Sequence, residues 1–412
     1  MRFGVWRVAL RAILSEGFAG DKLVDVASIA SHFESLEDTR HTRNRKHRLV
    51  DVIVLCVAGI ICGCDGPTAI QRGAQERRTW LAQHLVLAHG IPSRDCIRRI
   101  LIALKPDAFQ KCFVNWIARA WSTDAAAVPT KRLIAIDGKT CRGSHDGGKN
   151  LGALHIVSAW ASEEGLALGQ VATEEKSNEI TAIPELLQQL ELKDTIVTID
   201  AMGCQKEIVA QIVKGHGDAV IAVKKNQSKL YDAIEEFFQE AIANDFEDRQ
   251  YRCRETLDEG HGRTDGRVYF LARVPKEFAP AKDWPQVKAI GYALRYTVHD
   301  DGRETVDVRY YISTRYLSGK RFAEAVRGHW SIESMHGVLD VTFREDAQRA
   351  RTGDGEQFEL VATVRRVDLE ARPVEGQHQK KNATVRLQPR LPRRSPTTYW
   401  RLIRAGRGVS VP

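Results

Sequence analysis

The chain has 412 residues, of which 43% are hydrophobic and 28% charged, a balance typical of a globular protein with two or three domains. No run reaches the roughly 18 uncharged apolar residues that a transmembrane helix needs. The basic N-terminal segment lacks a long apolar core and a small-residue cleavage site, so we expect no signal peptide and no membrane partner. The eight cysteines form no CxxC pair, which disfavours a zinc site and favours free thiols in a reducing, cytoplasmic compartment.

The formal net charge is +8, but the charge is unevenly distributed. Residues 371–412 contain ten Lys and Arg against one acidic residue, Glu375, so the remainder of the chain is close to neutral. A prediction of nucleic-acid binding must therefore depend on local patches and on chemistry, not on overall charge.

The first part of the chain predicts helices. Residues 1–27 form a lead-in segment, and residues 28–128 carry several apolar patterns of helical period, including the buried helix expected at 50–64. Basic clusters lie at 38–48, 75–78 and 96–100; the first, which includes Lys46, predicts a flexible arm or loop. These clusters indicate either a DNA-binding helical domain or an ordinary solvated surface, and the pattern alone leaves both open.

From residue 131 the pattern changes to strands and helices in the order β-β-β-α-β-α-β-α. The order predicts an α/β fold with a mixed sheet, built from 131–249 and 319–352. Residues 250–318 alternate as strands do and predict a β-rich insertion before a long helix that begins near Lys320. Asp137 follows the apolar run LIAI, and Asp200 follows IVTI, so both aspartates are expected at strand ends.

The long helix carries a polar stripe. At 100° per residue, one narrow stripe contains His329, Glu333, His336, Gly337, Asp340 and Arg344. Met335, Val338 and Leu339 fall on the opposite side. Such a stripe is either a solvated face or the wall of a site.

Asp137, Asp200 and one acidic residue of the stripe would form a set of carboxylates. Mg²⁺ prefers oxygen ligands and keeps several waters, so a few carboxylates suffice to hold it. Two such ions activate a nucleophile and stabilise the leaving oxygen at a phosphodiester. The alternative is that each aspartate only forms a turn, and the residues alone leave Glu333 and Asp340 as rivals for the third position.

Several motifs resemble the H-repeat-associated DDE transposases, the ISAs family of bacterial insertion sequences. They are AIDGKTCRGS, EEKSNEITAIPELL, VTIDAMGCQ, VKKNQ and RGHWSIESMHGVLDVTFREDAQRART, and they occur in that order. Residues 31–70 and the stretch GIPSRDCIRRIL at 90–101 resemble the associated helical domain of that family. The resemblance covers about 31–352 and implies an RNase H-like fold. It also implies a metal site of Asp137, Asp200 and Glu333 for Mg²⁺ or Mn²⁺, with Asp340 as the alternative ligand.

The resemblance further implies DNA as the partner and action as a homo-oligomer in the bacterial cytoplasm, associated with the nucleoid. Residues beside the motifs are candidates for DNA contacts because they are basic, aromatic or hydrogen-bonding. These candidates are Lys46, Lys139, Lys224, Gln227, Arg327, His329 and Trp330. Glu179 is either part of a helix cap or a residue near the site.

The chain departs from the family pattern in three places. Gly337 stands where the family has Trp, and Lys225 where it has Gly. After Arg351 the apolar periodicity fades, and 353–412 becomes basic and rich in proline. We hypothesise that this tail is a frameshifted reading of the original C-terminus, which sequencing of the locus would test; the alternative is a basic, disordered DNA-binding tail.

The sequence therefore predicts a transposase that cuts at the ends of its element and joins them to target DNA. Two alternatives remain: a DNA-binding remnant without catalysis, favoured by the altered tail, and an RNase H-like nuclease that cleaves without joining. The sequence shows no Arg…HxxR…Tyr set, which disfavours a tyrosine recombinase.

Overall fold

The computed structural model describes residues 26–61, 64, 66–120, 131–145, 152–163, 165–173, 179–244, 246–247, 249–260 and 262–341. Residues 1–25 of the lead-in, Arg344 of the polar stripe and the whole of the predicted tail at 353–412 lie outside these residues. The chain divides into two compact units, one of residues 1–191 and 329–372 and the other of residues 192–328 and 373–412. Each unit is described by itself.

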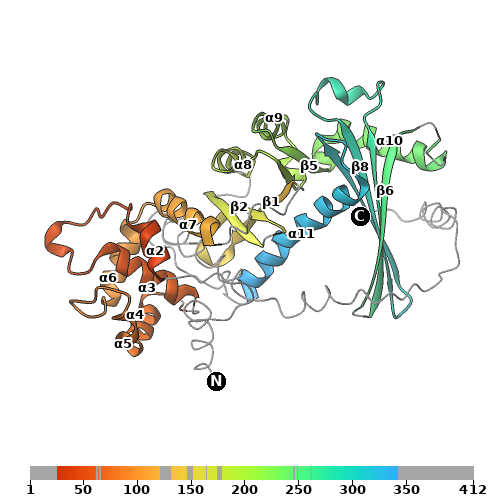
Figure 1. The fold of residues 1–412 in the computed structure, drawn as a ribbon. Helices are drawn as coiled ribbons and strands as arrows, with labels where there is room; N and C mark the ends of the chain where they lie inside the picture. The colour runs from red at the N-terminus through yellow and green to blue at the C-terminus, as the bar shows by residue number, and fades with distance from the viewer. Residues whose placement is uncertain are drawn as a thin grey trace. The chain divides into compact units, whose positions relative to one another are not determined.

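The first unit begins with a helical domain (Figure 1). Its helices are α2 (Val26–Phe33), α3 (Leu49–Ile61), α4 (Pro67–Glu76), α5 (Arg78–Leu81), α6 (Arg94–Ala103) and α7 (Pro106–Ala120). α3 is the apolar segment that was predicted to be buried, and it lies at the centre of the domain's core. Phe33, Phe109 and Trp116 are among the largest fully buried side chains, and they join α2 to α7.

The basic cluster at 38–48 is a loop with one 3-10 turn, Thr42–Asn44. Arg40 donates two hydrogen bonds to the Asp38 carboxylate, at 2.8 and 2.7 Å, and a third to the His47 carbonyl at 2.9 Å. Arg45 donates to the carbonyls of Asp38 and Arg40. Two of the basic side chains are therefore used to close the loop, whereas Lys46 is exposed.

The first unit continues with three antiparallel strands in the order β3-β2-β1. They are β1 (Arg132–Cys141), β2 (Leu154–Ala161) and β3 (Leu166–Thr173). α8 (Glu179–Gln188) packs against β2 and β3 through Ala182, Ile183, Leu186 and Leu187. The expectation that Asp137 ends its strand is wrong, because β1 continues to Cys141 and residues 138–141 pair with β2.

The second unit starts with β4 (Thr195–Ile199), α9 (Lys206–Lys214), β5 (Asp218–Val223) and α10 (Ser228–Ala243). β4 and β5 are parallel. The order of elements from β1 to α10 along the chain is therefore the predicted β-β-β-α-β-α-β-α. Asp200 directly follows β4, as expected.

The predicted β-rich insertion consists of four antiparallel strands: β6 (Tyr251–Gly260), β7 (Arg263–Arg273), β8 (Ala289–His299) and β9 (Glu304–Ser313). The alternation that predicted the insertion belongs to β7, β8 and β9; β6 was missed, because nine of its ten positions are exposed and it carries no apolar alternation. β9 also pairs with β5, so the strands of the second unit run in the order β4-β5-β9-β8-β7-β6.

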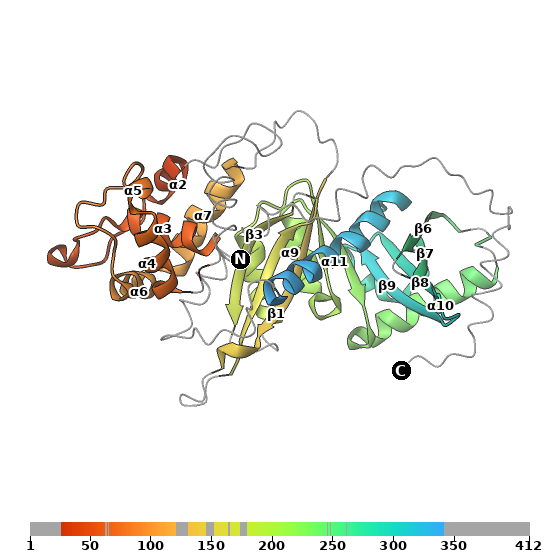
Figure 2. The same ribbon diagram turned by 90° about the horizontal axis from the view of Figure 1, so that it is seen from below.

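The long helix is α11 (Gly319–Val341), which continues from the second unit into the first (Figure 2). In the second unit, Phe322 packs edge-on against Tyr269 and Tyr311. In the first unit, the helix buries an apolar face of Ile332, Met335 and Leu339 against Ala135 of β1 and Trp160 of β2. No helix within the described ranges is long and apolar enough to cross a membrane.

Candidate functional site

The alternation of β1 sorts its side chains onto two faces. Ala135 packs against α11, so Asp137 and Lys139, two and four residues further on, also point to α11. The carboxylate Oδ2 of Asp137 lies 3.5 Å from Nδ1 of His336. The side chain of Asp137 is 22% exposed and that of His336 is 11% exposed, so the two groups meet at the edge of the interface between β1 and α11.

Burial alone would raise the pKa of Asp137. The hydrogen bond to His336, the positive charges of His336 and His329, and the backbone N–H of Gly138 outweigh burial and hold the pKa of Asp137 below its usual value. Asp137 is therefore an ionised carboxylate at neutral pH, in a place that is partly open to solvent.

Lys139 does not face solvent as a DNA contact would. Its Nζ lies 2.7 Å from Oδ1 of Asp340, and its side chain is 7% exposed. A buried lysine needs a counter-charge because desolvation of an unpaired ammonium costs several kcal/mol. Asp340 supplies this charge, so its carboxylate is already committed to an ion pair.

Glu333 lies on the same helix, three residues before His336, and it is exposed. Residues three apart on a helix are neighbours, so Glu333 lies one turn before His336 and on the exposed side of the helix. Among the described residues Glu333 forms no ion pair, in contrast to Asp340. The polar stripe is therefore divided: His336 and Asp340 turn inward to β1, and Glu333 remains outside.

Asp200 belongs to the second unit. It caps the 3-10 turn Ala201–Gly203 by accepting a hydrogen bond from the backbone N–H of Met202 at 2.9 Å. Asn226 donates to the carbonyl of Ala201 at 2.6 Å, and Gln227 donates to the carbonyl of Cys204 at 2.9 Å. Gln227, predicted to contact DNA, thus fixes the loop that carries Asp200.

Cys204, which closes the loop after Asp200, is fully buried. Burial, together with the negative charge of Asp200, raises the pKa of the Cys204 thiol to about 12. The thiol is therefore protonated and is unsuited to act as a nucleophile.

The other predicted DNA contacts have varied surroundings. Lys224 is exposed and precedes the turn Lys225–Gln227, whereas His329 and Trp330 are half-buried on α11. Arg327 is 46% exposed but lies 3.3 Å from Asp258 of β6. A phosphate bound by Arg327 would therefore compete with the Asp258 carboxylate for the guanidinium.

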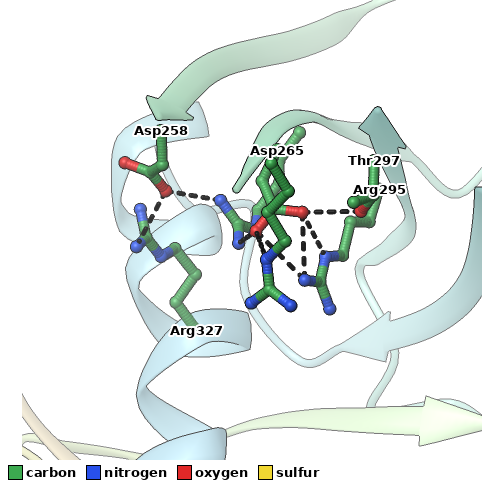
Figure 3. A network of polar contacts seen from close by, with 7 residues as sticks. Asp258, Asp265, Arg295, Thr297 and Arg327 are labelled. Carbon is green, nitrogen blue, oxygen red and sulfur yellow. Dashed lines mark hydrogen bonds and ion pairs between the residues drawn. The ribbon is translucent and has the colours of Figure 1, made fainter. Parts of the chain in front are cut away.

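Asp258 and Arg327 belong to a larger network on one face of the insertion (Figure 3). At its centre, the buried Asp265 of β7 accepts hydrogen bonds from Thr297 at 2.6 Å and from two nitrogens of Arg295. Arg263 and Arg267 also pair with Asp265, and Arg267 bridges to Asp258. Burial would raise the pKa of Asp265, but these hydrogen bonds and charges outweigh it and lower the pKa.

A second polar group lies on the opposite face of β1, and little in the sequence pattern points to it. His155 of β2 and Glu179, the first residue of α8, are buried, with Nε2 and Oε1 2.6 Å apart. This distance is that of a close polar contact between the two side chains. Nδ1 of His155 lies 2.9 Å from Oγ1 of Thr140. The one signal in the sequence was Glu179 itself, which lies within the motif EEKSNEITAIPELL.

The predicted ligands suit a divalent ion. They are carboxylates, the hard oxygen donors that Mg²⁺ and Mn²⁺ prefer; Asp137 is ionised, and Glu333 is exposed on α11. The described residues contain no ready group of three His, Cys, Asp or Glu side chains at metal-binding spacing. Asp137 and Glu333 belong to one unit and Asp200 to the other, so the three-carboxylate set remains a prediction.

Comparison with known protein families gives two matches. Residues 30–117 match the DDE_Tnp_1-associated family, and residues 129–365 match the family described as transposase DDE domain. These ranges correspond to the helical domain and to the α/β part with its insertion.

Three relatives illustrate the similarity. "Putative transposase YncI" of Escherichia coli O157:H7 is 38% identical over 88% of this chain and 93% of its own length. "H repeat-associated putative transposase YhhI" of Escherichia coli K12 is 36% identical over 84% of this chain and 90% of its own length. An uncharacterised protein from the dhlA 3′ region of Xanthobacter autotrophicus is 35% identical over 63% of this chain and 85% of its own length.

Proposed function

The chain belongs to the DDE transposase family, and from this premise we propose that it cuts DNA at the ends of an insertion sequence of the ISAs type and joins those ends to target DNA. Its relatives and its family matches support a transposase acting on DNA. The finer proposal is a two-metal transfer of phosphodiesters on an RNase H-like fold, carried by Asp137, Asp200 and Glu333.

The observation that carries the proposal is the place of Asp137. It is an ionised, partly exposed carboxylate on β1, facing the helix that bears Glu333. Among the described side chains its partner is His336, at 3.5 Å, and the apolar packing of β1 against α11 does not itself require a carboxylate. Glu333 is preferred to Asp340 as the third ligand because Asp340 neutralises the buried Lys139.

In this proposal each residue has a distinct task. A divalent ion, Mg²⁺ or Mn²⁺, supplies Lewis acidity for the attacking and leaving oxygens when it is bound. Asp137, Asp200 and Glu333 hold the ion by their carboxylates. His336 and the Asp340–Lys139 pair fix α11 against β1 and so keep Glu333 beside Asp137.

DNA binding is proposed for the helical domain and for the exposed cations Lys46 and Lys224, with His329 and Trp330 beside the site. Guanidinium, ammonium and aromatic groups contact phosphates and bases in this way. Action on two ends at once would require a homo-oligomer.

The test is cleavage and joining of a labelled duplex that carries the DNA flanking the gene, with Mg²⁺ or Mn²⁺. We expect nicks and strand-transfer products from the wild type and neither from Asp200→Ala. Nicks without joining would favour a nuclease. DNA binding without cleavage in the wild type would contradict the proposed activity and favour a catalytically inactive remnant, consistent with the altered residues 353–412.

A further inference from the structure

The buried pair His155–Glu179 lies directly behind the backbone that presents Asp137. Gly138 follows Asp137, and its missing side chain would point to the face of β1 opposite α11. A Cβ at this position would overlap Oε1 of Glu179 and Nε2 of His155. The pair therefore occupies the space that any side chain at 138 would need. It lies directly against the backbone of β1 at Gly138, between Asp137 and Lys139.

The pair connects three segments of the chain. Thr140 comes from β1, His155 from β2 and Glu179 from the first turn of α8, and they are joined by contacts of 2.9 and 2.6 Å. A carboxylate in the first turn of a helix is stabilised by the positive end of the helix dipole. Through His155, the contacts therefore link the first turn of α8 to Thr140 of β1, which directly follows Asp137–Lys139.

Stability alone is a weak reason for an ionisable pair at this position. The rest of the α8 interface is apolar, with Ala182, Ile183, Leu186 and Leu187 buried. His155 and Glu179 are 1% and 4% exposed, so both polar groups lose their contact with water. Replacing a buried ion pair by apolar side chains of similar volume is often neutral or stabilising. The His155–Glu179 pair is better explained by the backbone position that it sets in β1 at Gly138.

We propose that Glu179, acting through His155, is a positioning residue: it fixes the backbone at Gly138 and so holds the Asp137 carboxylate in place for metal binding. This inference depends on the proposed function, since it assumes that Asp137 is a metal ligand. It predicts that Glu179 affects the affinity for the metal without touching the metal. Groups that orient ligands in this way typically change metal affinity about 10- to 100-fold.

The experiment is titration of the full chain with Mn²⁺, followed by calorimetry or electron paramagnetic resonance, alongside thermal unfolding of each variant. Glu179→Ala should weaken Mn²⁺ binding about 10-fold or more. Glu179→Gln keeps an acceptor oxygen for His155 and should restore most of the affinity. Leu186→Ala is the matched control, because Leu186 is buried in the same α8 interface but does not contact Gly138; it should lower the unfolding temperature and leave the affinity unchanged.

Two results would overturn the inference: wild-type affinity in folded Glu179→Ala, or equal weakening by Leu186→Ala. If Glu179→Ala fails to fold, Thr140→Val, which removes only the contact to His155, is judged by the same measurements.

Asp137→Asn separates this inference from the proposed function. If that variant binds Mn²⁺ as the wild type does, the metal role of Asp137 is wrong, and amide hydrogen exchange decides the positioning role. Faster exchange at residues 137–140 in Glu179→Ala but not in Leu186→Ala would support it, and unchanged exchange there would overturn it.

Discussion

Asp137 and Asp265 are both strand aspartates whose pKa is held below the usual value, yet their surroundings differ. Asp265 is satisfied on all sides by Thr297, Arg263, Arg267 and Arg295. Asp137 accepts from the backbone N–H of Gly138 and, among the described side chains, contacts His336 at 3.5 Å. A carboxylate can accept about four hydrogen bonds, so Asp265 has little capacity left, whereas Asp137 retains most of its own. We infer that the first holds the insertion together and that the second is kept for a ligand.

The comparison is tested most strongly by activity. Asp137→Asn removes a proposed metal ligand and should lower the rate of DNA cleavage about 1,000-fold or more, the range for removing one member of a catalytic unit. Asp265→Asn, assayed below its unfolding temperature, should stay within about 10-fold of the wild type, since indirect effects of this kind are smaller. A gel assay with labelled DNA measures both. Equal losses in the two variants would contradict the division of roles.

The loss of stability should be larger for a substitution at Asp265 than for one at Asp137, the reverse of the order expected for activity. Asp265→Ala leaves a cluster of arginines without their central partner and should lower the free energy of unfolding by about 3 kcal/mol. Asp137→Ala loses one contact at a partly exposed site and should cost about 1 kcal/mol or less. Urea unfolding followed by circular dichroism measures the difference. An Asp137 variant that is the less stable of the two would show that this carboxylate is structural.

Acid should act on the insertion through Asp265. Because its pKa is lowered by folding, the stabilisation is complete above the ordinary aspartate pKa of about 4 and is lost as the pH falls through the lowered value. Urea midpoints measured from pH 7 to pH 3 should therefore fall more steeply at the acidic end in the wild type than in Asp265→Asn. Parallel curves would show that the lowered pKa of Asp265 does not contribute.

The smallest effect is expected at an exposed pair in the same insertion. Arg309 and Asp307 lie 3.0 Å apart, but their side chains are 44% and 51% exposed. Exposed pairs contribute about 0 to 1 kcal/mol, so Arg309→Ala should change the urea midpoint little. A loss as large as that of Asp265→Ala would mean that charge, and not burial, governs the stability of the insertion.

The sequence predicted the order of elements well because each strand of the α/β part carries a continuous apolar run and each helix a 3.6-residue period. It failed at β6, whose residues are nearly all exposed and give no such signal. Asp137 was placed at a strand end because the apolar run LIAI stops before it; the pairing of residues 138–141 with β2 continues the strand beyond that run.

For the site, the stripe on α11 could be predicted from spacing, but its division could not. Whether His336 and Asp340 turn inward depends on Asp137 and Lys139, which lie about 200 residues earlier in the chain. The His155–Glu179 contact could not be predicted from the sequence either, because it depends on how β2 and α8 pack in the folded chain. A periodic pattern shows which face of an element is buried and not which polar side chain meets which.

The exposed strand β6 also bears on solubility. In the order of the described strands it is the outermost of its unit, and an outer strand presents unpaired backbone groups that can recruit another chain. β6 carries five charged residues, Arg252, Arg254, Glu255, Asp258 and Glu259. Charges of both signs on such a strand oppose intermolecular pairing. The lack of apolar alternation therefore made β6 hard to predict, and the same charged surface disfavours aggregation along this edge.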